Sequence, residues 1–290
     1  MMSDRDAESS TTGTSAVGII AAGGPMPFAV ANSLIANGRE PVLFALKSLA
    51  SPADVVRYRH HWIPIGKLGA LFRLLRAESC RDVVFIGTMV RPALSEIRLD
   101  LKTLRVMPQI LKAFRGGDDH LLSSVGRIFE REGLHLRGIS EVAPDLLMPA
   151  GCLTRRAPDV EAEADIAKGR ALLGALSPFD IGQAVVIIDG HVIGVEGIEG
   201  TDGLLARIAQ LRHEGRIRAK AGRGVLVKAP KNAQDLRYDL PTMGPRTVEG
   251  VVAAGLGGIA IAAGQSIVAE PQTMVAAADK AGVFVLGLTP

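Results

Sequence analysis

The stretch VGIIAAGGPMPFAVANSLIANGREPVLFAL, residues 17–46, has the pattern of a strand, a helix and a second strand. Residues 17–24 form an apolar run that ends in two glycines, which is typical of a buried strand followed by a tight turn. The sequence predicts a helix over about 27–37 and a second apolar strand over 41–46. Two strands joined by a helix make a βαβ unit, which we expect to be right-handed.

Further helix and strand patterns follow on both sides of a break near residue 150. In the first half, 67–77 and a segment from 118 to about 132 are predicted helices, and 82–86 is a third strand. This predicts an open, mostly parallel, Rossmann-like sheet. Residues 151–164, GCLTRRAPDVEAEA, contain a proline, three acids and no strand pattern. The sequence therefore predicts a linker over 151–163, or the start of the next helix after Pro158.

The second half of the chain predicts a mixed-sheet α/β domain. Two strands at 184–189 and 191–196 are separated by Asp189-Gly190, a strong hairpin signal. More strands are predicted at 224–229, 258–262 and 283–287, with helices between them. The fold class is therefore α/β with two domains. The expected divisions are a disordered leader over 1–14, an N-terminal domain over 15–150, a linker over 151–163 and a C-terminal domain over 164–290.

The composition narrows the class of function. The net charge of +3 is mild, and no basic segment is interleaved with aromatic residues, which argues against nucleic acid as a partner. Cys80 and Cys152 are far apart and match no metal or redox spacing, so a reduced, cytosolic protein is expected. The first 14 residues are polar and lack the apolar core of a signal peptide, and no apolar run is long enough to span a membrane.

The segment KAPKNAQDLRYDLPTMGPRT, residues 228–247, has the composition of a phosphate site. Its cations can neutralise phosphate oxygens, while its carboxylates can hold a hard metal ion or orient water. Three prolines and a glycine restrict the backbone around them. The alternative is an irregular surface loop with charge pairs. The charged residues are the cations Lys228, Lys231, Arg237 and Arg246 and the carboxylates Asp235 and Asp239.

Three other segments contain candidate binding residues. Gly23-Gly24-Pro25 follows a strand and precedes a helix, where backbone amides can approach phosphate, although an ordinary strand–helix turn would look the same. Gly116-Gly117-Asp118-Asp119 opens a helix, either as a ligand loop or as acids that favour a helix start. The run EGIEGTDG, residues 196–203, places three acids at the end of a strand, as a pocket wall or as one cap with solvated acids.

Several of these runs together resemble one known family. They are GDDHLL at 117–122, DIGQAVVIIDGHVIGVEGIEGTDG at 180–203, KAPKNAQDLRYDLPTMGPRTVEG at 228–250 and AAGLGGIAIAAG at 253–264. The chain resembles the UDP-2,3-diacylglucosamine pyrophosphatases of lipid A biosynthesis, in the class unrelated to the calcineurin-like metallophosphatases. The resemblance covers nearly everything after the leader. It is looser in the first half, where GGPMP and GTMVRP are the matching turns.

This resemblance implies hydrolysis of UDP-2,3-diacylglucosamine to UMP and 2,3-diacylglucosamine 1-phosphate (lipid X), with Mg²⁺ or another divalent cation. The substrate would lie between two α/β domains, and water would attack the sugar-side phosphorus. The family's essential aspartate matches Asp235, with Asp239 as the nearby alternative, and both are expected metal ligands. Lys228, Lys231 and Arg237 would hold the diphosphate. The expected substrate-binding residues are Gly23, Gly24, Thr88 and Arg91 at the uridine end, Gln183, Glu199, Thr201 and Asp202 at the glucosamine side, and Asp118, Asp119 and Gln234.

The resemblance also implies partners and a location. A substrate with two acyl chains resides in a bilayer, so a cytoplasmic enzyme that associates peripherally with the inner membrane is expected, and mild basicity would help it meet anionic lipid. A homodimer is expected from the resemblance. Two alternatives remain. One is a nucleotide-sugar or lipid carrier without catalysis, and the other is an NAD(P)-linked oxidoreductase. Against the oxidoreductase, the first turn lacks G-x-G-x-x-G and no acid ends the second strand.

Overall fold

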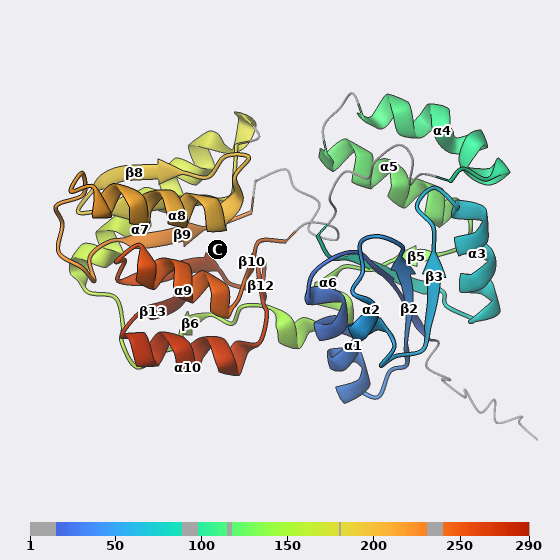
Figure 1. The fold of residues 1–290 in the computed structure, drawn as a ribbon, viewed down its shortest axis with the longest axis horizontal. Coiled ribbons are helices and arrows are strands. Elements are labelled where there is room, and N and C mark those ends of the chain that lie inside the picture. Colours follow the sequence, from blue (N-terminus) through green and yellow to red (C-terminus); the bar gives the residue numbers. More distant parts are fainter. Residues whose placement is uncertain (1–15, 89–97, 115–117, 180, 231–239, 290) are drawn as a thin grey trace, which may run out of the picture.

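The chain folds into two α/β domains that lie side by side (Figure 1). The computed structural model describes residues 16–88, 98–114, 118–179, 181–230 and 240–289, and it describes side chains in these ranges except at 110–124. The fold class predicted from the sequence is confirmed. One sheet is parallel, the other is mixed, and each is covered by helices.

The N-terminal domain is built on a parallel sheet with the strand order β3-β2-β1-β4-β5. Strand β1 is buried along its whole length and lies between β2 and β4. Unbroken apolar runs suit this position because helices cover both faces of a parallel sheet. The order places the ends of β1 and β4 together at a switch point, where open α/β sheets bind ligands. The strands are β1 (Val17–Ala21), β2 (Pro41–Leu46), β3 (His60–Ile63), β4 (Asp82–Ile86) and β5 (His135–Leu136).

Helices cover this sheet in two layers. Val30 and Leu34 of α1 pack with Ile139 in one apolar cluster. Phe72 of α3 and Phe129 of α5 meet edge to face in the other, with ring centroids 4.9 Å apart. The helices are α1 (Met26–Ala36), α2 (Pro52–Val55), α3 (Leu68–Ala77), α4 (Leu101–Phe114), α5 (Asp118–Arg131) and α6 (Ile139–Val142), followed by the 3-10 turn η2 (Pro144–Leu146).

The C-terminal domain contains a six-stranded mixed sheet with the order β6-β13-β11-β9-β7-β8. Strands β9, β11 and β13 are parallel, while β7, β8 and β6 run antiparallel to their neighbours. Asp189 and Gly190 both have positive φ, 48° and 76°, as the predicted tight hairpin requires. The strands are β6 (Gly151–Cys152), β7 (Ala184–Ile188), β8 (His191–Val195), β9 (Val225–Lys228), β11 (Gly258–Ala262) and β13 (Phe284–Leu288).

The segment predicted as a linker over 151–163 is partly ordered into this domain. Strand β6 pairs antiparallel with β13 at the edge of the sheet, and α7 begins at Val160. The Asp159 carboxylate caps α7 by accepting the Ala162 amide at 2.8 Å. A two-residue, exposed edge strand needs no apolar run, which is why the sequence pattern did not show it.

Helices lie on both faces of the second sheet. Ile166 and Leu173 of α7 pack on one face, with residues of β7 and β9. Leu204 of α8, Val251 of α9 and Met274 of α10 belong to the apolar cluster on the other face. The helices are α7 (Val160–Leu176), α8 (Gly200–His213), α9 (Pro245–Ala253) and α10 (Pro271–Ala281), with the 3-10 turn η3 (Ser177–Phe179) after α7.

A short parallel ribbon joins the two domains. It consists of β10 (Thr242–Met243) and β12 (Ile267–Val268). Ile267 forms an isolated bridge with Leu147, and Ile267 and Ala269 pack into the apolar core of the N-terminal domain. Residues from the second half of the chain therefore complete the core of the first domain.

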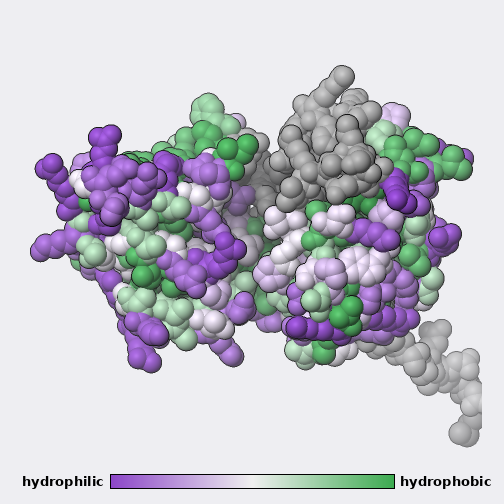
Figure 2. All heavy atoms as spheres, in the orientation of Figure 1, coloured by the Kyte–Doolittle hydropathy of each residue, from purple (hydrophilic) through white to green (hydrophobic). Residues whose placement is uncertain are grey.

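The surface view shows polar residues over much of the C-terminal domain and apolar residues gathered along the upper edge (Figure 2). In the described ranges, every helix is too short or too polar to cross a bilayer.

Candidate active site

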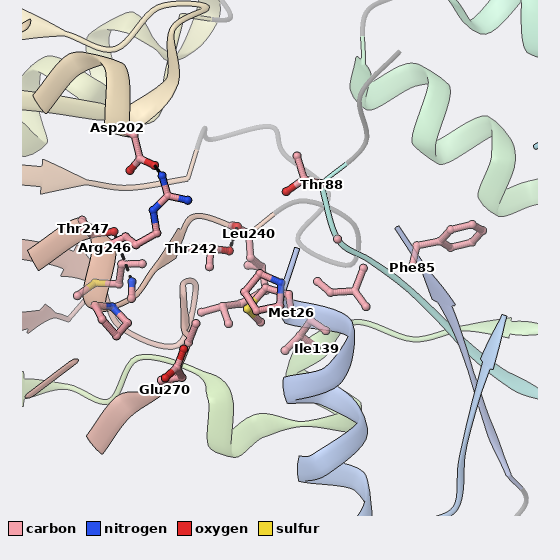
Figure 3. Close-up of a pocket in the computed structure, with 18 residues that line it drawn as sticks. Met26, Phe85, Thr88, Ile139, Asp202, Leu240, Thr242, Arg246, Thr247 and Glu270 are labelled. Carbon is pink, nitrogen blue, oxygen red and sulfur yellow. Dashed lines mark hydrogen bonds and ion pairs between the residues drawn. The ribbon is translucent and has the colours of Figure 1, made fainter. Parts of the chain in front are cut away.

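A pocket of about 510 Å³ lies between the domains (Figure 3). The N-terminal domain contributes the start of α1 and the residues that end β4, which is the switch point of its sheet. The C-terminal domain contributes Asp202 of α8, the ribbon strand β10, the start of α9 and the turn before α10. The pocket therefore forms only when both domains are in place.

The first turns of four helices border this pocket. Pro25 and Met26 lie at the start of α1, Pro245 at the start of α9, Asp202 in the first turn of α8 and Glu270 before α10. At the starts of α1, α8 and α10 the capping residue accepts no first-turn amide through its side chain, and at the start of α9 the Gly244 amide donates to the Thr247 hydroxyl at 3.4 Å. Uncapped amides and the positive ends of helix dipoles favour an anionic ligand. The Asp202 and Glu270 carboxylates on the same wall add negative charge, and Arg246 adds one positive charge.

The turn after β1 and the end of β4 are held together by backbone hydrogen bonds. The Gly23 amide donates to the Thr88 carbonyl at 3.0 Å, and the Thr88 amide donates back to the Gly23 carbonyl at 2.7 Å. A β-carbon on Gly87 would lie 2.7 Å from the Gly23 oxygen, so this contact requires glycine. Gly24 has a φ of 85°, which glycine adopts without strain. The structure thus places Gly23, Gly24 and Thr88 together beside the pocket.

Lys228 is the buried cation of the second domain, with 5% of its surface exposed at the end of β9. Its ammonium donates to the Thr201 hydroxyl at 2.9 Å and to the Thr242 carbonyl at 3.1 Å. Thr242 lines the pocket, so the lysine lies directly behind the pocket wall. Thr201 and Lys228, 27 residues apart in sequence, are brought into contact here.

Glu196 completes this buried network. Its carboxylate accepts the Thr201 hydroxyl at 2.6 Å and the Gln183 amide at 2.6 Å. Glu196 is 8% exposed and was not among the predicted site residues, although it belongs to the acidic run at 196–203. The signal that could have found it is Gly182. A β-carbon there would lie 2.5 Å from the Glu196 carbonyl oxygen, so this glycine allows the two segments to touch.

The other two acids of that run have different surroundings. Glu199 pairs with Arg207 of α8 at 3.0 Å. The pKa of Glu199 is below its usual value because its own backbone amide, and then Arg207, stabilise the carboxylate. Asp202 lines the pocket and pairs with the exposed Arg246 at 3.2 Å (Figure 3).

Glu270 is a pocket residue that the sequence pattern did not reveal. It precedes α10 in a left-handed conformation, with φ 51° and ψ 60°. Such a conformation is unfavourable for a residue with a side chain, and strained residues of this kind cluster at functional sites. It places a carboxylate on the pocket wall beside Ala269.

Several predicted site residues fall outside the part of the chain that the structure describes. Asp118 and Asp119 begin α5, but their side chains are not described. In the described ranges, no three His, Cys, Asp or Glu side chains come close enough to hold a metal ion. The residues outside the described ranges are Arg91, Lys231, Gln234, Asp235, Arg237 and Asp239.

Comparison with known proteins matches both domains. The model of the LpxI N-terminal domain family matches residues 16–146, and that of the LpxI C-terminal domain family matches residues 149–286. The chain belongs to the LpxI family. Among curated relatives, the UDP-2,3-diacylglucosamine pyrophosphatase LpxI of Caulobacter vibrioides is 41% identical over 274 residues, which cover 94% of this chain and 98% of the relative.

The two LpxI family domains meet where the structure changes from one domain to the other. Residues 147 and 148, between the two matches, hold the chain against the ribbon at the joint: Leu147 bridges to Ile267, and the Met148 amide donates to the Ser266 carbonyl at 2.8 Å. The pocket of this LpxI family member therefore takes residues from both matched domains.

Proposed function

We propose that this chain hydrolyses the pyrophosphate of UDP-2,3-diacylglucosamine, giving UMP and 2,3-diacylglucosamine 1-phosphate (lipid X) for lipid A and lipopolysaccharide biosynthesis. The observation that carries the proposal is the end-to-end likeness to a pyrophosphatase that acts on this substrate, in both domains that form the pocket. The proposal places the chain in the class unrelated to calcineurin-like metallophosphatases, because its sequence lacks their several Asp/His/Asn motifs.

In this proposal the substrate lies across the two domains. The uridine end faces Gly23, Gly24 and Thr88, where backbone amides at the start of α1 can meet a phosphate. The glucosamine side faces α8 and the network of Gln183 and Thr201. The diphosphate then lies between helix starts of opposite domains, which is where positive potential from the backbone is concentrated.

The chemistry requires neutralisation of charge more than covalent catalysis, since a phosphoanhydride already has a good leaving group. Lys231 and Arg237 hold the diphosphate oxygens, and Lys228 adds positive charge from its buried position behind the pocket wall at Thr242. Asp235 aligns the water that attacks the sugar-side phosphorus. Mg²⁺, which we propose Asp235 and Asp239 bind, would supply further neutralisation of phosphate charge. Breaking the anhydride releases UMP from one domain and the lipid phosphate from the other.

Incubation of the purified chain with UDP-2,3-diacylglucosamine and Mg²⁺ tests the proposal. We expect UMP and lipid X in equal amounts by mass spectrometry, with ¹⁸O from labelled water in the lipid phosphate and none in UMP. Chelation of the divalent cation should stop turnover. Intact substrate after long incubation would instead support a carrier that binds without cutting.

A variant pair tests the role of Asp235. Asp235→Asn should abolish turnover but retain the fold and substrate binding, because the amide keeps the shape and loses the charge. Asp54→Asn is the matched control, since Asp54 is a partly exposed acid whose ion pair is with Arg57, three residues away on the surface. Turnover by Asp235→Asn close to that of the control would refute the role.

We further propose that the protein acts as a homodimer at the cytoplasmic face of the inner membrane. A substrate with two acyl chains resides in that bilayer, and the chain carries a net charge of +3 that favours an anionic surface. Light scattering of the purified protein gives its mass in solution. A mass equal to that of one chain would contradict the dimer.

A further inference from the structure

Three leucines near the start of α4 face solvent. Leu99 is 43% exposed, Leu101 is 75% exposed and Leu104 is 51% exposed. Leu101 and Leu104 are three positions apart and therefore share one face of the helix. Single exposed apolar side chains are ordinary, whereas three exposed leucines within residues 99–104 concentrate apolar surface in one short segment.

These leucines are not needed by the core of their own domain. The inward face of α4 is already occupied by Thr103, which is 3% exposed and donates to the Gly66 carbonyl at 2.6 Å, and by Val106, which packs against the core cluster of α3 and α5. The Leu68 amide also donates to the Thr103 hydroxyl at 3.0 Å. The helix is thus fixed by one face and presents an apolar strip on another.

The surroundings of this strip are basic. Arg98 and Arg105 are exposed on either side of it. The neighbouring acids are engaged elsewhere. Asp100 accepts hydrogen bonds from the Gly69, Ala70 and Thr103 amides, and Glu132 pairs with Arg76 and Lys102. Arg98 and Arg105 flank the strip in sequence, and among the described residues neither forms an ion pair. An apolar strip with exposed arginines at both ends complements an anionic lipid surface.

The C-terminal domain carries a second apolar group. Phe179, at the end of η3, is 72% exposed, Ile181 is 38% exposed and Ile198, after β8, is fully exposed. The hydrogen bond between the Gln183 amide and Glu196 holds these two segments next to each other. Figure 2 shows apolar residues along the upper edge of the C-terminal domain and at the outer upper corner of the N-terminal domain.

We propose that this edge docks on an anionic bilayer. The docking edge consists of Arg98, Leu99, Leu101, Leu104 and Arg105 of the first domain and Phe179, Ile181 and Ile198 of the second. The apolar side chains enter the interface while the arginines reach lipid phosphates. The contact is reversible because so few apolar groups cannot anchor a protein permanently. The docking inference rests on the proposed function in one respect only: that function identifies the lipid substrate that the membrane-bound enzyme would reach.

Flotation of the full chain with vesicles tests the docking edge. The probes are phosphatidylcholine vesicles with and without phosphatidylglycerol. We expect wild-type protein to float with the anionic vesicles, and Leu101→Asp/Leu104→Asp to bind them roughly tenfold more weakly. Arg98→Ala/Arg105→Ala should weaken binding to the anionic vesicles and leave binding to the neutral vesicles unchanged. The remaining binding to anionic vesicles should depend less on salt than that of the wild type. The control is Val160→Asp/Val252→Asp, at two positions that are 79% and 46% exposed outside this edge.

Further readouts separate the possible outcomes. Leu101→Asp/Leu104→Asp should retain the wild-type melting temperature and wild-type turnover of detergent-dispersed substrate. Wild-type protein that does not float, or equal binding by the leucine variant and its control, would overturn the docking edge. A loss of dimer in the leucine variant with unchanged vesicle binding would assign the strip to a second copy and overturn it too. Absent turnover of dispersed substrate by wild-type protein that floats would reject the proposed function and leave docking intact.

Discussion

Glu196 and Lys228 show how a charged pair is kept inside the second domain. Both are almost fully buried, and the Thr201 hydroxyl stands between them, donating to the carboxylate and accepting from the ammonium. Burial of either charge alone is costly, but these hydrogen bonds and the opposite charges offset the loss of water. The network fixes the ammonium of Lys228 behind the pocket wall at Thr242.

Replacing the bridging hydroxyl tests this network. Thr201→Val has nearly the same shape and leaves one buried donor and one acceptor unsatisfied, so we expect the free energy of unfolding to fall by about 1–3 kcal/mol. Thr201→Ser keeps the hydroxyl and should lose less than half as much. Chemical denaturation of the two variants gives the comparison. Equal losses would show that the methyl group, and not the hydroxyl, matters at this position.

The two cysteines should differ sharply in reactivity. Burial, and then the charge of Glu78, raise the pKa of Cys80 from 9.0 to about 12, whereas Cys152 is exposed. A thiol reagent at pH 8 should therefore modify one cysteine in the native protein and two in denaturant. Because the unfolded thiol ionises first, the contribution of Cys80 to stability should fall as pH rises from about 9 towards 12. Native Cys152→Ser protein that still reacts rapidly would contradict this assignment.

At the scale of elements, one carboxylate joins two helices. Asp100 accepts the Gly69 amide at 2.8 Å and the Ala70 amide at 3.2 Å in the first turn of α3, and the Thr103 amide at 2.9 Å in the first turn of α4. Burial raises the pKa of Asp100, but the hydrogen bonds from Thr103, Ala70 and Gly69 together outweigh it and hold that pKa below 3.8. The position of α4, and of its exposed leucines, depends on this residue.

Asp100→Ala should therefore destabilise the protein by about 1–2 kcal/mol for each helix that loses its cap. Since the folded pKa lies below the unfolded one, the stabilisation is complete at neutral pH and disappears as pH falls below 3.8 through the folded value. Unfolding measured at pH 7 and near pH 3 should show a smaller difference between variant and wild type at the lower pH. Asp54→Asn, at a partly exposed acid, is the control.

The backbone bridge between the turn after β1 and the end of β4 supports a second prediction at this scale. Gly87 has a φ of 116°, and a β-carbon there would collide with the Gly23 oxygen. Gly38 also has a positive φ, 72°, but a β-carbon there would meet nothing within 4 Å. Gly38→Ala should lower the free energy of unfolding by about 1–3 kcal/mol through backbone strain alone. Gly87→Ala should lower it further, because of the added collision, and should also weaken the binding of UDP. Calorimetric titration with UDP, alongside thermal melts, would show whether the two variants differ.

At the scale of the whole molecule, the domains share a core at their joint. Ile267 is 1% exposed and packs with residues of the first domain, although it follows β11 of the second. A ligand in the pocket also touches both domains. The two domains should therefore unfold together, and substrate should raise the temperature of that single transition.

Ile267→Ala tests this coupling. A cavity at the joint should cost about 2–4 kcal/mol and separate the calorimetric transition into two, since the contact between domains is what weakens. Ile259→Ala, inside the core of the second domain alone, should cost a similar amount without producing two transitions. A single transition in both variants would show that the domains are coupled by other contacts.

The sequence predicted most of the architecture because apolar runs report burial directly. The runs at 17–21 and 41–46 became central parallel strands, and Asp189-Gly190 formed its hairpin. The residues of the candidate site were predicted less completely from the sequence. Glu270 reached the pocket wall without a motif, and Glu196, although part of the acidic run at 196–203, entered a buried network instead. A carboxylate acquires its role from the groups that lie opposite it. The roles predicted for Asp235 and its basic neighbours remain predictions.

The amino-acid sequence by itself determined the two α/β domains, their strands and turns, and the family likeness. Apolar periodicity and the placement of glycines act over a few neighbouring residues, so they can be recognised in the sequence. Only the tertiary structure decided that four helix starts from two domains border one pocket, and that Lys228 meets Glu196 through Thr201. These contacts join residues far apart in the chain. Their geometry follows from how the sheets and the ribbon at the joint pack, which no local pattern specifies.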